Sequence, residues 1–440
     1  MREACEILVA AVCPLSCKYC YIPKDPLMKT MHEEIREAMR NGELLNHLQS
    51  VFNTDQLKYL GFWGTEPATV FPDILQFLEK AQRVFPRLKN LSFSTSFIFP
   101  PKTYLKFLKG IDSLGKDYKV SMQISLDGPS WITDKNRMEG VTERVVNNWK
   151  NFINSLNSTP LRNIKLSLKW KATHSIENME EFLREPHKVE EYVLFFETLN
   201  NYFIRHNKNK QVTLALKSYV PTLVVPGKYT SEDGRIFAKY LRLLHSKGLR
   251  SSYSYRLKRL IVYERELTKN PSCFTCSGGR SNFGLSDKLT ICHRGFYLND
   301  ERYVKAVLSH PNLENWDVSC FEKGFLDVYK KNFVVNPRDE ANKTRFYYIM
   351  RNYHDYLSLK VAATEAILIE LAKAGQASRI YLESQELRTF FSLFINSALS
   401  CPSENILNTG SLHLQTLSLI RLFANGAFEE LIRYELSRGK

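Results

Sequence analysis

The strongest constraint on the fold is a repeated alternation in the first 220 residues. Short apolar or β-branched runs, typical of buried strands, alternate with longer amphipathic stretches, typical of helices. The candidate strands are residues 6–12, 59–63, 91–95, 119–126, 164–172 and 212–220. The candidate helices are residues 32–52, 71–85, 101–108 and 142–156. This pattern predicts an α/β fold of βα units around a parallel sheet, either a partial barrel or an open doubly wound sheet.

The character of the sequence changes after this region, which predicts further domains. Residues 231–267 are helical in pattern and basic, and a stretch rich in Cys, Gly and Ser follows. A boundary near Thr268 is therefore expected. From residue 341 to the end, the apolar spacing is that of amphipathic helices. We predict four regions, namely residues 1–230, 231–267, 268–340 and 341–440.

The charge of the chain favours an acidic partner but does not identify one. With 61 Lys and Arg against 46 Asp and Glu, the net charge is +15. Such a balance suits nucleic acid, an anionic cofactor or an acidic peptide. The basic residues are scattered along the whole chain, as on an ordinary solvated surface, so composition does not favour nucleic acid binding.

The longest apolar runs are much shorter than the roughly 20 residues that a membrane span needs. The run at residues 7–12 before Cys13 superficially resembles a lipoprotein signal. Acidic Glu3 and bulky Val12 directly before the cysteine argue against cleavage there. We therefore expect a cytoplasmic protein with no membrane partner, whose chain begins with a buried strand.

Three of the nine cysteines fall within eight residues, in the run Cys13-Pro-Leu-Ser-Cys17-Lys-Tyr-Cys20. Close cysteines in a chain without a secretion signal are better interpreted as metal ligands than as a disulfide framework. Three thiolates directly after a strand can hold three corners of a cubane cluster and leave the fourth iron open. A structural zinc site is the alternative, but it needs four ligands and no fourth lies nearby.

This spacing, with aromatic Tyr19 before the last cysteine, resembles the radical S-adenosylmethionine (SAM) superfamily. The resemblance implies a [4Fe-4S] cluster on Cys13, Cys17 and Cys20, and these three residues would be catalytic. SAM would bind the open iron, and an electron from the cluster would cleave it to a 5′-deoxyadenosyl radical that abstracts hydrogen from a substrate carbon.

Other short motifs at strand ends resemble the same superfamily. The second predicted strand ends in Gly64-Thr65-Glu66-Pro67, similar to a Gly-Gly-Glu-Pro motif that contacts SAM, with Thr65 in place of the second glycine. The third predicted strand ends in Ser94-Thr95-Ser96, where relatives often have Thr-Asn-Gly. The block Ser125-Leu-Asp127-Gly-Pro, followed by Arg137, resembles the subfamily of anaerobic sulfatase-maturing and peptide-modifying enzymes. The resemblance implies that the cofactor-binding residues are Tyr19, Gly64, Thr65, Glu66, Pro67, Thr95, Ser125, Asp127 and Arg137, with Asp127 nearer the substrate.

A second cysteine group lies in the third predicted region. The residues Cys273, Cys276, Cys292 and Cys320 resemble the start of a SPASM or twitch extension, which would hold an auxiliary [4Fe-4S] cluster. Four thiolates at such spacings also suit zinc, so both interpretations stay open. The resemblance implies a partial (β/α)6 TIM-like barrel with a small Cys-rich SPASM/twitch-like extension and a helical C-terminal region.

By the same resemblance, we expect an oxidoreductase that modifies a peptide or protein side chain by oxidation or cross-linking. Its electron donor would be a reductant such as flavodoxin or ferredoxin. One alternative is a radical SAM enzyme that acts on a small metabolite or a nucleic acid. Another is a non-catalytic iron-sulfur or zinc scaffold, although such a scaffold does not need the motifs at Glu66 or at Ser125 to Arg137.

Overall fold

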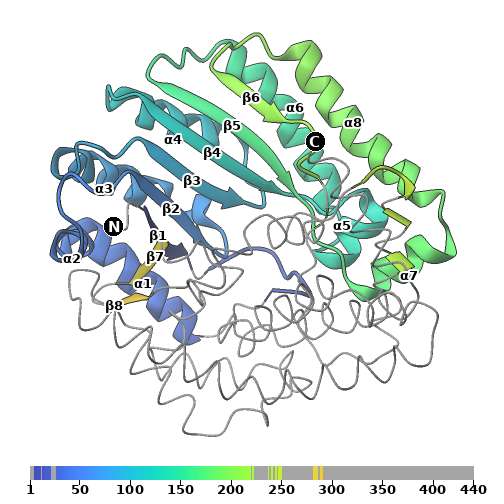
Figure 1. Ribbon diagram of the computed structural model, residues 1–440, viewed down its shortest axis with the longest axis horizontal. Coiled ribbons are helices and arrows are strands. Elements are labelled where there is room, and N and C mark those ends of the chain that lie inside the picture. The colour runs from blue at the N-terminus through green and yellow to red at the C-terminus, as the bar shows by residue number, and fades with distance from the viewer. Residues whose placement is uncertain are drawn as a thin grey trace, which may run out of the picture.

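A computed structural model describes residues 4–10, 12–20, 26–219, 221, 236, 239–240, 243–244, 246–249, 281–285 and 288–290 of the chain. Its core is one sheet of eight strands (Figure 1). These are β1 (Ala4–Ala10), β2 (Tyr59–Gly64), β3 (Asn90–Thr95), β4 (Tyr118–Ser125), β5 (Ile164–Lys171), β6 (Val212–Ala215), β7 (Ser281–Leu285) and β8 (Lys288–Thr290). All six predicted strands are confirmed, although β6 is shorter than expected.

The strand order is β6-β5-β4-β3-β2-β1-β7-β8. Strands β1 to β6 are parallel neighbours in chain order, β7 pairs with β1 in parallel, and β8 returns antiparallel to β7. A doubly wound sheet would reverse its strand order at a switch point, and these six strands do not. The prediction of a parallel α/β sheet is therefore confirmed. The barrel itself stays a prediction, because β6 and β8 do not pair with each other in the described sheet.

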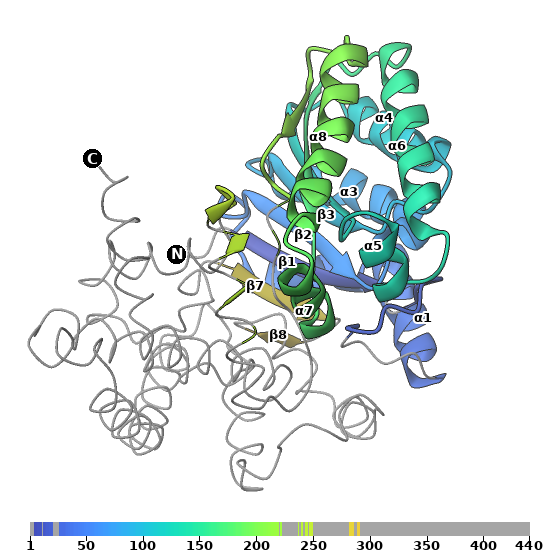
Figure 2. The ribbon, with the colours of Figure 1, turned by 90° about the vertical axis from the view of Figure 1, so that its right-hand side faces the viewer.

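One layer of helices covers one face of this sheet, as the two views show (Figure 1 and Figure 2). Its members are α1 (Pro26–Asn41), α2 (Glu43–Val51), α3 (Phe71–Val84), α4 (Pro101–Ser113), α5 (Ser130–Asn136), α6 (Val141–Asn157), α7 (Ile176–Arg184) and α8 (Lys188–His206), with the short 3-10 helix η1 (Pro67–Val70). The helix expected at residues 32–52 is two helices, because Gly42 takes a left-handed conformation between α1 and α2. Helices α5, α7 and α8 were not predicted.

The two faces of the sheet differ in polarity because side chains alternate along each strand. On β5, Ile164, Leu166, Leu168 and Trp170 are buried, and Trp170 packs against Trp149 of α6. The opposite face, here called the polar face, consists of Glu6, Tyr59, Trp63, Asn90, Ser92, Ser94, Lys119, Ser121, Gln123, Ser125, Lys165, Ser167, Lys169 and Lys171. The described helices therefore cover the apolar side of the sheet and do not cover the polar side.

Gly64, at the end of β2, is a position that only glycine can occupy. Its φ is +139°, and a Cβ atom there would lie 2.0 Å from the carbonyl oxygen of Ala10 at the end of β1. Changing Gly64 to Ala should lower the free energy of unfolding by about 3 kcal/mol, because it combines backbone strain with a backbone clash. Urea unfolding will measure this loss.

The matched control is Gly115→Ala. Gly115 also has a positive φ, +71°, but a Cβ atom there would meet nothing within 4 Å. This variant should cost only about 1 kcal/mol. Equal losses in the two variants would contradict the close approach of β1 and β2.

No helix among the described residues has the length and apolar character that a membrane crossing requires.

Candidate functional site

The predicted site residues of the first four strands gather at one edge of the sheet. Because β1 to β4 are parallel, their carboxyl ends lie at the same edge. Residues 12–20 follow β1, residues 65–67 follow β2, Thr95 ends β3, and Ser125 ends β4. Clustering of functional residues at this edge is typical of parallel βα folds.

The segment of residues 12–20, here called the cysteine loop, is anchored in the protein core. Leu15 is 1% exposed, while Cys13, Cys17 and Cys20 are half-buried and pack against that core. The backbone N–H of Cys20 donates to the Cys17 carbonyl at 3.1 Å, which closes a turn. The three thiols thus occupy a folded loop beside the strand ends.

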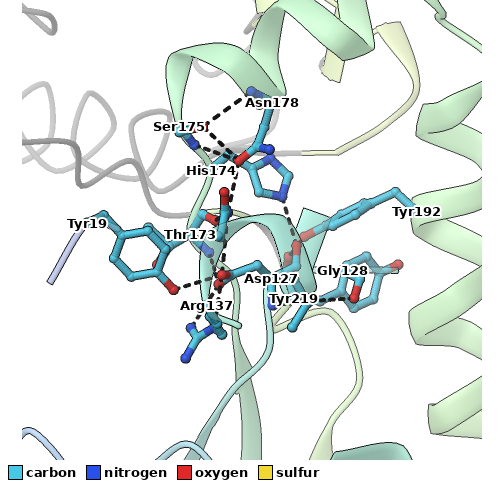
Figure 3. A network of polar contacts seen from close by, with 12 residues as sticks. Tyr19, Asp127, Gly128, Arg137, Thr173, His174, Ser175, Asn178, Tyr192 and Tyr219 are labelled. Atoms are coloured by element: carbon cyan, nitrogen blue, oxygen red, sulfur yellow. Dashed lines mark hydrogen bonds and ion pairs between the residues drawn. The ribbon is translucent and has the colours of Figure 1, made fainter. Parts of the chain in front are cut away.

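Tyr19 fastens the cysteine loop to the end of β4 (Figure 3). Its hydroxyl donates to Oδ2 of Asp127 at 2.7 Å. Asp127 is fully buried and accepts two further hydrogen bonds, both at 2.9 Å, from Nε and Nη2 of Arg137. The Arg137 guanidinium also lies 5.5 Å from the centre of the Tyr19 ring. The Asp127 carboxylate therefore joins the cysteine loop to Arg137, the C-cap residue of α5.

Further donors complete the hydrogen bonding of the Asp127 carboxylate. The backbone N–H of Thr173 donates to Oδ1 at 3.0 Å, and the amide of Asn136 approaches Oδ2 at 3.5 Å. The Asn136 carbonyl in turn accepts from the backbone N–H of Lys18 at 2.8 Å, a second link to the cysteine loop. Since both Asp127 oxygens are taken by the protein, the geometry favours a positioning role for this residue over direct ligand contact.

Electrostatics keep Tyr19 and Arg137 of this network protonated. Burial alone would lower the pKa of Arg137, but the charge of Asp127 outweighs it and holds that pKa well above its ordinary value. Burial raises the pKa of Tyr19 well above its ordinary value, and the nearby charge of Arg137 only partly opposes this. Tyr19 therefore remains a hydrogen-bond donor, and Arg137 remains charged.

His174, directly after the end of β5, contacts the backbone of Asp127 and so joins the network. It is fully buried, its Nε2 lies 3.0 Å from the Asp127 carbonyl oxygen, and its Nδ1 contacts the hydroxyl of Tyr240. Because the carbonyl can only accept, Nε2 carries the proton and Nδ1 accepts from Tyr240. Burial lowers the pKa of His174 to about 4, so the imidazole is neutral in the folded protein.

This lowered pKa predicts acid sensitivity. Between pH 6.5 and pH 4, the unfolded chain binds a proton at His174 and the folded chain does not, so the free energy of unfolding falls as the pH falls. The loss from this residue should reach about 2–3 kcal/mol by pH 4.5. Urea unfolding at pH 7 and pH 4.5 will measure it. His174→Gln keeps a donor for the carbonyl and should lose less, whereas an equal loss in both proteins would contradict this assignment.

Thr65 joins the ends of β1 and β2. Its backbone N–H donates to the Ala10 carbonyl at 2.8 Å, and its hydroxyl approaches the same oxygen at 3.3 Å. The hydroxyl thus adds a contact that glycine cannot make. Both the backbone and the side chain of Thr65 therefore hold the end of β2 to the end of β1.

Glu66 joins β2 to β3 from a fully buried position. Its Oε1 accepts from the Thr95 hydroxyl at 2.7 Å and from the backbone N–H of Ala68 at 3.2 Å. Its Oε2 accepts from the backbone N–H of Ser96 at 2.7 Å and from the Ser96 hydroxyl. Burial raises the pKa of Glu66, although these donors oppose the rise. Glu66 and Thr95 hence fix the geometry of two strand ends.

The remaining predicted residues fall into three groups. Pro67 is buried at the first position of η1, and Ser125 is half-buried on the polar face. Among the described residues, no three His, Cys, Asp or Glu side chains lie close enough together to form a metal site. The cluster ligands therefore stay a prediction, which the donor chemistry fits because three thiols share one short loop. The second cysteine group, Cys273, Cys276, Cys292 and Cys320, lies outside the described residues.

Sequence reasoning missed Asn136, Thr173, His174 and Tyr240 as parts of the site. Asn136 directly precedes Arg137 in the sequence block that resembles related enzymes. Its position in the sequence could therefore have indicated a place in the site. Thr173 and His174 directly follow a predicted strand, the usual place for site residues in a parallel sheet. Tyr240 is far away in the sequence, and no local pattern could connect it to His174.

No family model and no curated protein matches the chain. Two crystal structures of SuiB from Streptococcus suis match with a TM-score of 0.33. The structure bound to S-adenosylmethionine is 16% identical and the match covers 76% of this chain, whereas the structure bound to the precursor peptide SuiA is 14% identical with 75% covered. The chain spans 64% of the length of each SuiB chain. Such a low TM-score does not establish a shared fold.

Proposed function

We propose that this protein is a radical SAM enzyme that modifies a carbon of a peptide or protein substrate. The observation that carries the proposal is the hydrogen bond from Tyr19 to Asp127. It joins the cysteine motif to a second motif 108 residues later, and a thiol site that only stabilised folding would not need this second motif. The links from Thr65 to Ala10 and from Glu66 to Thr95 bring the third motif to the same edge.

The cofactors would supply the chemistry, and the protein would hold and shield them. When bound, an iron-sulfur cluster and SAM would supply the electron and the hydrogen-abstracting group. Cys13, Cys17 and Cys20 would hold three irons, and Tyr19 would keep their loop at the strand ends. Gly64 and Thr65 would place backbone atoms of the β2 end beside the cofactor, and Glu66 would hold that end in position.

Ser125 and Arg137 have different parts in this proposal. Ser125 is half-buried on the polar face and would be within reach of a ligand at the carboxyl edge. Arg137 is 6% exposed and bound to Asp127 through two nitrogens, so its main contribution would be to hold Asp127 and Tyr19. We therefore assign Asp127 and Arg137 to positioning the cysteine loop.

Other parts of the proposal depend on the resemblance in sequence. The unreversed order of β1 to β6 supports a partial (β/α)6 barrel. A peptide substrate, an external reductant such as flavodoxin or ferredoxin, and an auxiliary cluster on the second cysteine group complete the proposed enzyme.

The function is tested with protein that is purified and reconstituted with iron and sulfide in the absence of oxygen. After addition of SAM and dithionite, we expect 5′-deoxyadenosine and methionine in equal amounts, as chromatography would show. The control omits dithionite and should form neither product. Protein that carries iron and sulfide but forms no deoxyadenosine would contradict the proposal.

A further inference from the structure

The polar face carries a line of positive charge that the proposed SAM chemistry does not use. On β5, the side chains that alternate with the buried apolar positions are Lys165, Ser167, Lys169 and Lys171. Lys119 of β4 is paired directly with Lys165, and Lys210 lies just before β6 beside the same end of the sheet. We call Lys119, Lys165, Lys169, Lys171 and Lys210 the lysine track.

Two adjoining pockets lie along this track. The larger, of about 600 Å³, is lined by Lys119, Lys165 and Lys210 at the amino end of the strands. The smaller, of about 210 Å³, is lined by Lys169, and the linings of both pockets include Tyr59 and Ser121. The two pockets, here together called the hollow, therefore adjoin at Tyr59 and Ser121, over the middle and the amino end of the polar face.

The charges along this hollow are poorly balanced within the described part of the chain. Four lysines line the two pockets, and Glu6 is the one carboxylate among the lining residues. Glu6 accepts from the hydroxyl of Tyr59 at 3.4 Å and lies close enough to Lys169 for this lysine to oppose the rise of its pKa, so it can balance one of the four lysines. Like charges directly opposite each other on neighbouring strands, as at Lys119 and Lys165, destabilise a sheet. An anionic ligand across this pair would remove that repulsion.

The shape of the track favours an extended ligand. Lys165 and Lys171 are six residues apart on one strand, which corresponds to about 20 Å. The track also leads from the amino edge to the carboxyl edge, where the candidate site lies. A compact anion would contact only one end of such a line, whereas an extended peptide of about six residues would match its length.

The neighbouring side chains favour a peptide over a nucleic acid. Single-stranded nucleic acids are usually bound by aromatic side chains on which successive bases stack. The aromatic side chains of the polar face that line the pockets, Tyr59 and Trp63, lie on β2, which β3 and β4 separate from the β5 part of the track. The positions beside the track on β4 are Ser121 and Gln123, and Ser167 lies within it. These small polar groups suit hydrogen bonds with a peptide backbone. We propose that the lysine track binds an acidic, extended segment of a peptide substrate, an inference that rests on the proposed function and specifies its substrate.

The test measures binding by fluorescence anisotropy, without SAM or reductant. The probe is a labelled eight-residue peptide of alternating Glu and Gly, compared with a Gln and Gly counterpart and with an oligothymidylate of equal charge. We expect the acidic peptide to bind at least about tenfold more tightly than the neutral one. The double variant Lys119→Gln, Lys165→Gln should weaken that binding about tenfold.

The matched control, Lys102→Gln with Lys106→Gln, removes the same charge from exposed positions of α4 on the opposite side of the sheet. It should change the affinity less than twofold. The inference is overturned if both double variants weaken binding equally, if the oligothymidylate binds more tightly than the peptide, or if the wild-type protein binds no acidic peptide.

The two proposals can fail separately. Protein that cleaves SAM but does not distinguish the acidic from the neutral peptide refutes the lysine track alone. Protein that binds the acidic peptide through Lys119 and Lys165 but never forms deoxyadenosine supports the track as a binding site and refutes the proposed enzyme. Should the Lys119 and Lys165 variant fold poorly, the wild-type response to salt decides, because charge-based binding must weaken as ionic strength rises and salt-independent binding would overturn the inference.

Discussion

Replacing Asp127 by Ala should lower the free energy of unfolding by about 3–5 kcal/mol, which urea unfolding will measure. Asp127 is fully buried and accepts hydrogen bonds from Tyr19, Arg137 and Thr173. Its loss leaves the Arg137 charge buried without a counter-ion, which costs far more than the loss of an exposed ion pair. The same change removes the acceptor for Tyr19, so the cysteine loop should also bind iron more weakly.

Two further variants show whether the pairing causes this loss. Asp117→Ala removes an exposed carboxylate and should change the stability by less than about 0.5 kcal/mol. Asp127→Ala combined with Arg137→Met leaves no buried charge and should be less destabilised than the sum of the two single variants. Strict additivity, or a loss below about 1 kcal/mol for Asp127→Ala, would show that this carboxylate does not organise the site.

Changing Cys13, Cys17 or Cys20 singly to Ala should abolish SAM cleavage. Each of these thiols would hold one iron of a cluster whose fourth iron must stay open for SAM, so no protein ligand can be spared. The rate of 5′-deoxyadenosine formation should fall to that of a protein-free control in all three variants. Chromatography of anaerobic reactions, together with iron and sulfide analysis of each variant, will measure the effect.

Cys5 provides the matched control within the same region. It lies fully buried on β1, where burial raises the pKa of its thiol, so it stays protonated and unsuited to bind metal. The Cys5→Ala variant should therefore keep its iron and its activity, apart from a modest loss of stability. A result in which this variant is inactive while Cys17→Ala retains activity would mean that the ligand assignment is wrong.

The sequence predicted the sheet well because its signals are local. Alternating burial, as in Ile164 to Lys171 of β5, is visible in the sequence as alternating apolar and polar residues. The helices were harder to predict. Gly42 ends one helix and precedes the next without interrupting the amphipathic pattern, and α8 buries only part of its surface. The order of β1 to β6 within the sheet could not be predicted from periodicity, because it depends on contacts between segments that are distant in the sequence.

The candidate site shows the same limit. Strand-end motifs such as Glu66-Pro67 can be recognised in the sequence, and the structure brings them to one edge of the sheet. Their roles could not be read from the motif alone. Asp127 was expected near the substrate, yet its partners, among them Tyr19 and Thr173, are separated from it by 108 and 46 residues. The structure shows that both oxygens of its carboxylate accept hydrogen bonds from the protein. The SAM-contact roles of the site residues remain predictions.

Electron paramagnetic resonance can show whether the cysteine loop holds a cluster with an iron open to SAM. Wild-type protein is reconstituted anaerobically, reduced with dithionite, and measured before and after addition of SAM. We expect an iron-sulfur signal whose g values shift when SAM is added, and the loss of that shift when Cys13, Cys17 and Cys20 are all changed to Ala. A cluster signal that SAM leaves unchanged, or protein that takes up zinc and no iron, would contradict this expectation.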